Sequence, residues 1–255
     1  MENLAIENVN KTNFLVLHKI VDDTSFTQWE DVPKNFFIKI LNEIQLTSGI
    51  HINNKRVHNK KVLLTFDDGN SSDYEIVFPM LLERKINAIF FLIMNEVGNK
   101  GYLNWSQVKE MHKHGMTFGS HGLNHKSMSE LSDKETQNEF IKSKSILEDA
   151  IGSSVKYFSY PFGHFSKKSH ILGLSAGYDF LFTSNHGIAK KNSKILPRNN
   201  IHSGLDQKKI LRIMNPGLSL QLRWKIEDQL KISIKNSIGI EKYKKIRNKI
   251  FLKSN

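Results

Sequence analysis

The sequence predicts an α/β fold made of parallel strands, arranged as a single β/α barrel or as a doubly wound sheet. Short apolar runs alternate along the chain with segments of helical spacing, which is the pattern of βαβ units. The length of 255 residues suits one such domain, and the 39% of hydrophobic residues can fill its core. Residues of catalytic type directly follow several apolar runs, as expected where parallel strands end at a common active face.

Seven apolar runs have the length and composition of strands. They span residues 14–17, 62–66, 88–93, 116–119, 155–159, 179–183 and 195–197. Three helices are predicted to begin at a side chain placed three residues before an acid or amide, as in a capping box. These pairs are Ser72 with Glu75, Asn104 with Gln107, and Ser132 with Glu135. Gly115 and Gly152 are predicted to end helices, and Pro79 is predicted to kink the first helix or delay its start.

The chain is basic, with a net charge of +12 at pH 7 and a pI near 9.6. This charge favours an anionic neighbour, which includes nucleic acid, an acidic glycan, a nucleotide- or lipid-diphosphate substrate and an anionic membrane face. Ten Lys and Arg residues lie between residues 223 and 253, interleaved with apolar residues. We therefore expect residues 216–255 to form a basic amphipathic helical tail, packed on the domain or on a membrane surface.

The sequence contains no cysteine, which excludes disulfides and thiolate metal ligands. Its first residues lack the basic start and apolar core of a signal peptide, and no stretch is apolar enough to cross a bilayer. We therefore expect a cytoplasmic protein, in contact at most with the inner face of the cell membrane.

Two motifs contain the residues of a metal-dependent hydrolase. Asp67 and Asp68 follow an apolar run and precede Gly69, whose conformational freedom lets both carboxylates reach one cleft. His121 and His125 lie four residues apart, within reach of a common ion. An ion held by one carboxylate and two imidazoles keeps a coordination position open, and the second carboxylate can serve as a general base. Because magnesium prefers oxygen ligands, a metal-dependent phosphoesterase is the weaker alternative.

Three segments resemble, in order and spacing, the first three motifs of the polysaccharide deacetylases, carbohydrate esterase family 4. They are residues 65–69 (Thr-Phe-Asp-Asp-Gly), 120–125 (Ser-His-Gly-Leu-Asn-His) and 159–163 (Ser-Tyr-Pro-Phe-Gly). The resemblance implies a NodB-like catalytic domain over residues 1–215, with a distorted (β/α) barrel of about seven strands. The layout is most like that of bacterial poly-N-acetylglucosamine deacetylases within this family.

By position, the resemblance implies that Asp67 is the general base and that Asp68, His121 and His125 are the metal ligands. It implies zinc as the ion, with Co²⁺, Ni²⁺, Mn²⁺ or Fe²⁺ as alternatives. It also makes the backbone N–H of Phe162 a donor to the oxyanion that forms when water attacks the acetyl group.

For the acid that protonates the leaving amine, two histidines are candidates. His18 is our first choice, because the subgroup of poly-N-acetylglucosamine deacetylases has a histidine at the end of an amino-terminal strand, and the corresponding stretch here is Leu17-His18-Lys19-Ile20. His202 is the alternative, because other members take the acid from a late Leu-x-x-His motif.

The sequence departs from the family pattern at Ser159, where many members have an Arg that orients the catalytic Asp. We hypothesise that Arg198, which follows the last predicted strand, reaches across to Asp67 instead. His164 and His186 also follow predicted strands, and we expect both to be loop residues.

The resulting hypothesis is a metal-dependent hydrolase that removes an acetyl group from an N-acetylated sugar during assembly of a surface polysaccharide or lipopolysaccharide. The substrate form is left open among nucleotide-linked, lipid-linked and polymeric sugars, and no nucleic-acid partner is expected. Because the family's Arg is missing at Ser159, a non-catalytic relative that binds metal and carbohydrate is the main alternative.

Overall fold

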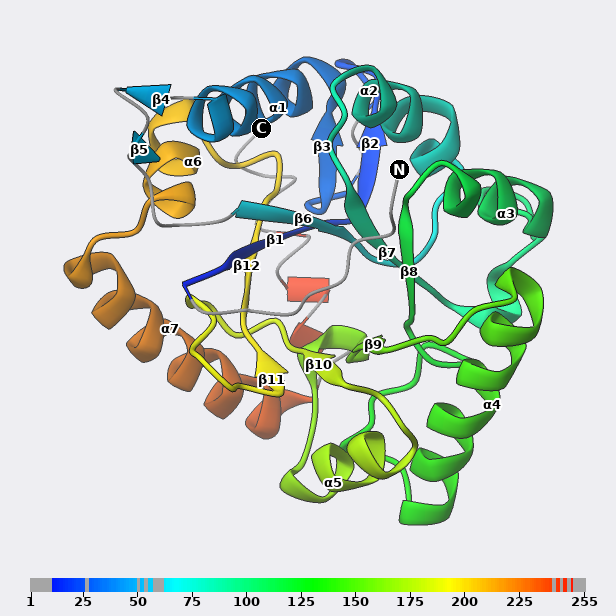
Figure 1. Ribbon diagram of the computed structural model, residues 1–255. Helices are drawn as coiled ribbons and strands as arrows, with labels where there is room; N and C mark the ends of the chain where they lie inside the picture. Colours follow the sequence, from blue (N-terminus) through cyan, green and yellow to red (C-terminus); the bar gives the residue numbers. More distant parts are fainter. Residues whose placement is uncertain are drawn as a thin grey trace.

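The chain folds into a nearly closed parallel β barrel surrounded by helices (Figure 1). This computed structural model describes residues 11–25, 28–49, 51–52, 55–56, 62–239, 242–243, 245–246 and 249. Eight strands form one sheet in the order β11-β10-β9-β8-β7-β6-β1-β12. They are β1 (Asn13–Leu17), β6 (Val62–Phe66), β7 (Ala88–Leu92), β8 (Thr117–Ser120), β9 (Tyr157–Ser159), β10 (Phe180–Phe182), β11 (Ile195–Leu196) and β12 (Arg198–Asn200). All seven predicted strands are present, with ends that differ by at most two residues.

The barrel closes through a single segment that is split at Pro197. β11 pairs with β10, whereas β12, which begins directly after Pro197, pairs with β1 at the other edge of the sheet. Proline lacks the N–H that would continue the ladder, so the chain changes partner at this residue. The two short strands together therefore take the place of one strand, the seventh, in the barrel. The predicted distorted (β/α) barrel of about seven strands is confirmed.

In the described part of the chain, seven named α-helices connect or follow these strands. They are α1 (Lys34–Gly49), α2 (Phe78–Glu83), α3 (Trp105–Lys113), α4 (Asp133–Ile151), α5 (Lys167–Ser175), α6 (Gln207–Met214) and α7 (Leu218–Ile238). Two small sheets lie outside the barrel, one of β2 (Lys19–Val21) with β3 (Asp31–Pro33) and one of β4 (His51–Ile52) with β5 (Lys55–Arg56). Among the described residues, no helix combines the length and the hydrophobicity needed to span a bilayer. Of the predicted tail, residues 240, 241, 244, 247, 248 and 250–255 lie outside the described part of the chain.

Two of the three predicted capping boxes are present, at the starts of α3 and α4. The prediction at Ser72 was wrong: its side chain does not cap a helix, and its Oγ instead accepts a hydrogen bond from the backbone N–H of Ile20. A π-helical turn, η1 (Asp73–Val77), precedes α2, in which Pro79 occupies the first turn. The helical segment starts at the π-helical turn and becomes α-helical only at Phe78, which agrees with the prediction that Pro79 kinks this helix or delays its start.

The core has two layers, one inside the barrel and one between the barrel and its helices. Alternation along β6 illustrates this division, since Leu63 packs in the inner cluster whereas Leu64 and Phe66 pack in the outer one. The aromatic rings of Phe91 and Phe182 fill the barrel interior 5.1 Å apart. The same alternation directs Asp67, directly after β6, toward the barrel axis.

Candidate active site

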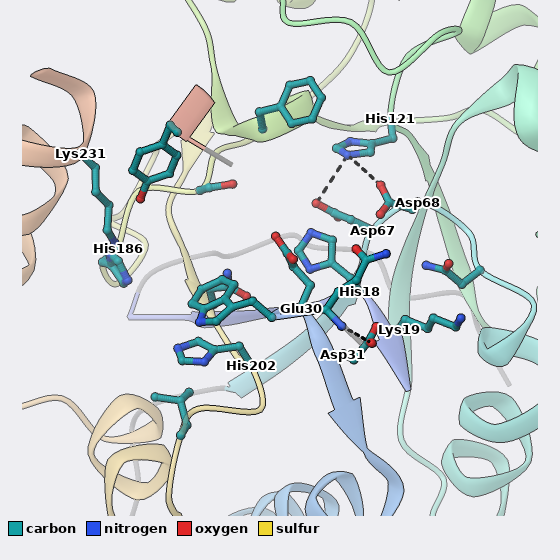
Figure 2. A pocket seen from close by; sticks show the side chains of 18 of the residues that line it. His18, Lys19, Glu30, Asp31, Asp67, Asp68, His121, His186, His202 and Lys231 are labelled. Atoms are coloured by element: carbon teal, nitrogen blue, oxygen red, sulfur yellow. Dashed lines mark hydrogen bonds and ion pairs between the residues drawn. The ribbon is translucent and has the colours of Figure 1, made fainter. Parts of the chain in front are cut away.

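Nearly all of the predicted site residues line one pocket at the carboxyl ends of the strands, with a volume of about 670 Å³. Those that line it are His18, Asp67, Asp68, His121, His125, Phe162 and His202. Arg198 lies beneath the pocket floor and is fully buried. Figure 2 shows His121 facing both carboxylates, with His18 close to Asp67.

One carboxylate and two imidazoles converge on a point suited to a metal ion. Asp68 Oδ1 lies 3.6 Å from His121 Nε2 and 3.5 Å from His125 Nε2. Three ligand atoms of these residues lie within 4.8 Å of one another. Ligands held about 2.0–2.1 Å from a tetrahedral zinc lie about 3.3 Å apart, so this spacing fits an ion after small adjustments. Asp68 Oδ1 is buried and makes no hydrogen bond, as expected of an atom whose partner is an ion.

Hydrogen bonds outside the triad fix the orientation of its ligands. His121 Nδ1 lies 2.8 Å from the Ser159 carbonyl oxygen, an acceptor that places the proton on Nδ1 and leaves Nε2 to face Asp68. Glu139 of α4, which is 4% exposed, accepts hydrogen bonds from the backbone N–H groups of Leu123 and Asn124. Its second oxygen accepts from the Asn124 side chain at 2.8 Å. Glu139 therefore holds the loop between the two histidines in shape.

Sequence reasoning missed Glu139, although a signal was available. The buried positions of α4 are residues 136, 139, 140, 143 and 147, which follow helical spacing. An acid in the middle of a buried helix face requires hydrogen-bond donors nearby. The position of Glu139 therefore predicts a buried hydrogen-bonded contact, but it does not identify the loop that supplies the donors.

Asp67 forms a bidentate salt bridge with Arg198 at the base of the pocket. Arg198 Nη1 donates to Asp67 Oδ1 and Nη2 donates to Oδ2, each at 2.7 Å. Ser159 Oγ donates to Oδ2 at 3.1 Å. Burial alone would raise the pKa of Asp67, but the Arg198 guanidinium, with a smaller contribution from His121, lowers this pKa well below its usual range. The carboxylate is therefore ionised and held in one orientation.

Every N–H of the Arg198 guanidinium has an acceptor. Besides its bonds to Asp67, it donates to the Thr183 carbonyl oxygen at 3.1 Å, to Thr65 Oγ1 at 3.2 Å and to Ser159 Oγ at 2.7 Å. The guanidinium carbon lies 5.4 Å from the centroid of the Phe91 ring, within range of a cation–π contact. Ser159, where the family resemblance led us to expect an Arg, thus bonds to an Arg supplied from a later strand.

The two candidate acids differ in their surroundings. His18 follows β1 and has a buried Nδ1 without a hydrogen-bond partner. It lies near enough to Asp67 to lower the pKa of that carboxyl. His202 stacks on the Trp29 ring at a centroid distance of 3.9 Å, and its Nδ1 accepts a hydrogen bond from the Gly204 N–H. In Figure 2, His202 lies farther than His18 from the paired carboxylates.

Phe162 has a left-handed backbone, with φ of 60° and ψ of 5°. Such a conformation costs a bulky residue roughly 1–2 kcal/mol. The Pro161 carbonyl accepts a hydrogen bond from the His164 N–H, which fixes the plane of the peptide that contains the Phe162 N–H. The Phe162 ring packs 4.4 Å from the His125 ring, next to the metal triad.

Helix α7 forms one wall of the pocket, which the sequence did not predict. Trp224, Lys231 and Lys235 of this helix line the pocket. Asp228 anchors the helix, because its two oxygens accept hydrogen bonds from the backbone N–H and the Nδ1 of His186, at 2.7 and 2.6 Å. His186 thus lies on a loop, as expected, but it also ties that loop to α7. Forty-two residues separate the two partners, and no local pattern links them.

The fold and this geometry can be compared with known proteins. The sequence profile of the polysaccharide deacetylase family matches residues 54–181, half of the chain. The chain belongs to the polysaccharide deacetylase family. It is 30% identical to YxkH of Bacillus subtilis (strain 168) over 138 residues, 54% of this chain and 50% of that protein. It thus spans half the length of this relative. It is 27% identical to a peptidoglycan-N-acetylglucosamine deacetylase of Bacillus cereus over 173 residues, 68% of each chain.

Solved structures of deacetylases share the fold. A structure of the Streptococcus pyogenes deacetylase PplD in complex with acetate superposes with a TM-score of 0.71 at 24% identity, over 81% of this chain and 99% of that chain. The structure of IcaB from Ammonifex degensii superposes with a TM-score of 0.67 at 20% identity, over 80% of this chain and 96% of that chain. The barrel of this family therefore extends over most of the described residues.

Proposed function

We propose that this polysaccharide deacetylase family member is a metal-dependent hydrolase that removes the acetyl group from an N-acetylated sugar. The observation that supports this best is the convergence of Asp68, His121 and His125 beside a second, ionised carboxylate in one pocket. Family membership and the barrel fold point the same way.

Asp67 is the proposed general base. A divalent ion held by the triad, with zinc as first choice, would polarise the acetamide carbonyl and raise the acidity of a water molecule. A carboxylate of low pKa suffices to take a proton from water whose acidity has been raised. The two bonds from Arg198 hold Asp67 in place for that transfer, so Arg198 is a proposed positioning residue.

His18 is the proposed general acid for the leaving amine. It lines the pocket near Asp67, and its buried, unpartnered Nδ1 is a polar atom that substrate or solvent can satisfy. His202 is better suited to the sugar-binding surface, because it stacks on Trp29 and accepts a bond from its own loop. The Phe162 N–H is the proposed donor to the oxyanion, since its peptide is held rigidly beside the triad.

The pocket favours a substrate with sugar rings. Trp29 and Tyr102 line it and offer aromatic surface, while carboxylates and amides supply hydrogen-bond partners. Several relatives are named as deacetylases of N-acetylglucosamine polymers, in peptidoglycan or as poly-β-1,6-N-acetyl-D-glucosamine. We infer an N-acetylhexosamine substrate, in polymeric, lipid-linked or nucleotide-linked form, used in assembly of a surface polysaccharide or lipopolysaccharide.

The test is acetate release by purified protein from poly-N-acetylglucosamine and from lipid-linked and nucleotide-linked N-acetylhexosamines. Activity should disappear after treatment with a chelator and return when Zn²⁺ is added. D67N should keep the ion and lose turnover, whereas the matched variant D68N should lose the ion. Sugar binding without acetate release would support the non-catalytic alternative, and phosphate release without acetate release would support a phosphoesterase. Either of these results would overturn the proposal.

A further inference from the structure

Helix α7 has two faces of different character. One face lines the pocket through Trp224, Glu227, Lys231 and Lys235. The helix also bears five large aliphatic side chains at intervals of four residues, which we call the α7 ridge; this row starts opposite the pocket face and winds around the helix until it reaches the edge of that face at Ile234. They are Leu218, Leu222, Ile226, Leu230 and Ile234, and they are 80%, 61%, 60%, 58% and 46% exposed. The pocket-facing side chains fix how the helix is rotated, so the exposure of the ridge follows from the way α7 is docked.

The α7 ridge is continuous. Side chains four residues apart on a helix are neighbours, so the five residues form one row. From Leu218 to Ile234 the row extends about 24 Å at 1.5 Å per residue. On the other described helices the exposed aliphatic residues number at most two, such as Ile171 and Leu174 on α5, and form no row of this length. A contiguous exposed apolar row of this length indicates a surface that meets an apolar partner.

The charges around the α7 ridge identify the kind of partner. The carboxylates of α7 are Glu227 and Asp228, and both belong to the pocket side of the helix, where Glu227 lines the pocket and Asp228 binds His186. Arg223 and Lys225 are exposed beside the ridge, although Arg223 also pairs with Glu227 at 2.7 Å. The net charge of +12 has the same sign. An apolar row beside Lys225 and Arg223, on a chain of net positive charge, matches a membrane whose headgroups are anionic.

We propose that the α7 ridge binds the surface of an anionic lipid bilayer. The ridge enters the boundary between headgroups and acyl chains, and Arg223 and Lys225 meet lipid phosphates. Since a helix is about 10 Å across, the pocket wall on the other side of α7 is then held beside the headgroups. The Asp228–His186 contact keeps α7 docked on the barrel in this arrangement. Binding of this kind requires no deacetylation, so the fate of the proposed reaction does not decide it.

The direct test uses the absence of cysteine from the chain. I226C, labelled with an environment-sensitive fluorophore, reports on the ridge, and I171C is a matched control, because Ile171 is 65% exposed on another helix, against 60% for Ile226. Vesicles of phosphatidylcholine with about one-third phosphatidylglycerol should blue-shift the probe at residue 226 and not at residue 171. Vesicles of phosphatidylcholine alone should give a much smaller shift, because the anionic headgroups are missing. Equal responses of the two probes, or none with anionic vesicles, would overturn the proposal.

A second test does not rely on a label. The triple variant L222S/I226S/L230S should bind anionic vesicles at least tenfold more weakly in a flotation assay, while I171S should bind as the unmodified chain does. Because all four side chains are exposed, both proteins should keep the same unfolding midpoint. Sedimentation velocity of the unmodified chain addresses the competing occupant, a second copy of this chain. A dimer that the triple variant dissociates, without vesicle binding by the unmodified chain, would assign the ridge to self-association and refute the membrane proposal.

Discussion

Replacement of Arg198 by methionine tests the pairing at the centre of the barrel. Methionine has a similar length and fits between aromatic rings, so R198M removes charge and donors with little change in volume. Asp67 would lose the two hydrogen bonds that Arg198 donates and keep the one from Ser159. At about 1.5–3 kcal/mol for each bond to a charged group, the loss is about 3–6 kcal/mol. This range overlaps the roughly 3–5 kcal/mol observed when one partner of a buried ion pair is removed.

The assay is urea unfolding of R198M, D67N and the double variant, each measured with a chelator present. If Arg198 acts through Asp67, the double variant should lose about 1–3 kcal/mol less than the sum of the single variants. The matched control R198K should recover part of the loss, because lysine restores charge without a bidentate contact. Additive losses within about 0.5 kcal/mol would refute the reasoning.

The same variants predict how stability depends on pH. In the unmodified chain the pKa of Asp67 is lowered, so its contribution is present above the unfolded pKa and is lost as the pH falls. In R198M burial should raise this pKa above the unfolded value, so Asp67 should destabilise the fold increasingly as the pH rises through the unfolded pKa. The free energy of unfolding should therefore differ more between the two proteins at pH 7 than at pH 4. Acetate release by R198M should also fall at least 100-fold with the ion retained, because the base is no longer oriented.

Four other substitutions have defined outcomes. H18Q should lower kcat for acetate release by 100-fold or more without loss of zinc, whereas H202Q should change kcat less than tenfold and raise KM; the reverse pattern would make His202 the acid. E139A should weaken zinc binding about 10- to 100-fold in a competition titration, because Glu139 shapes the loop between the histidines, and unchanged affinity would contradict this role. G119A would place a Cβ 2.5 Å from the Phe91 ring, so its unfolding midpoint in urea should drop by the equivalent of about 1–3 kcal/mol, and an unchanged midpoint would show that the barrel can relax there.

The sequence predicted the strands well, because buried parallel strands are short apolar runs that can be recognised locally. It also predicted that Asp67, Asp68, His121 and His125 would lie together, because carboxyl ends of parallel strands meet at one face of a barrel. Two of three capping boxes were predicted correctly. The third failed at Ser72, whose hydroxyl serves the distant residue Ile20, 52 positions away. A local capping rule cannot anticipate a competing donor from another strand.

Contacts between distant residues were beyond sequence reasoning. The Asp228–His186 contact and the role of Glu139 depend on how helices dock, which no local periodicity encodes. The sequence also did not predict that the last strand divides at Pro197 into β11, which pairs with β10, and β12, which pairs with β1. The hypothesis for Arg198 named the correct neighbour, Asp67, but not the network of five acceptors around the guanidinium.

By itself, the sequence determined the barrel fold and the types of side chain at the carboxyl ends of its strands. The alternation of strands and helices, the helix caps and the residues that follow each strand can all be recognised from neighbouring residues in the sequence. Tertiary structure decided which distant groups share a proton or a charge, such as Arg198 with Asp67 across 131 positions. It also decided which side of α7 lines the pocket and which side is left as an exposed apolar ridge. The physical reason is that burial and hydrogen bonding depend on distance in space, which chain position fixes only for near neighbours.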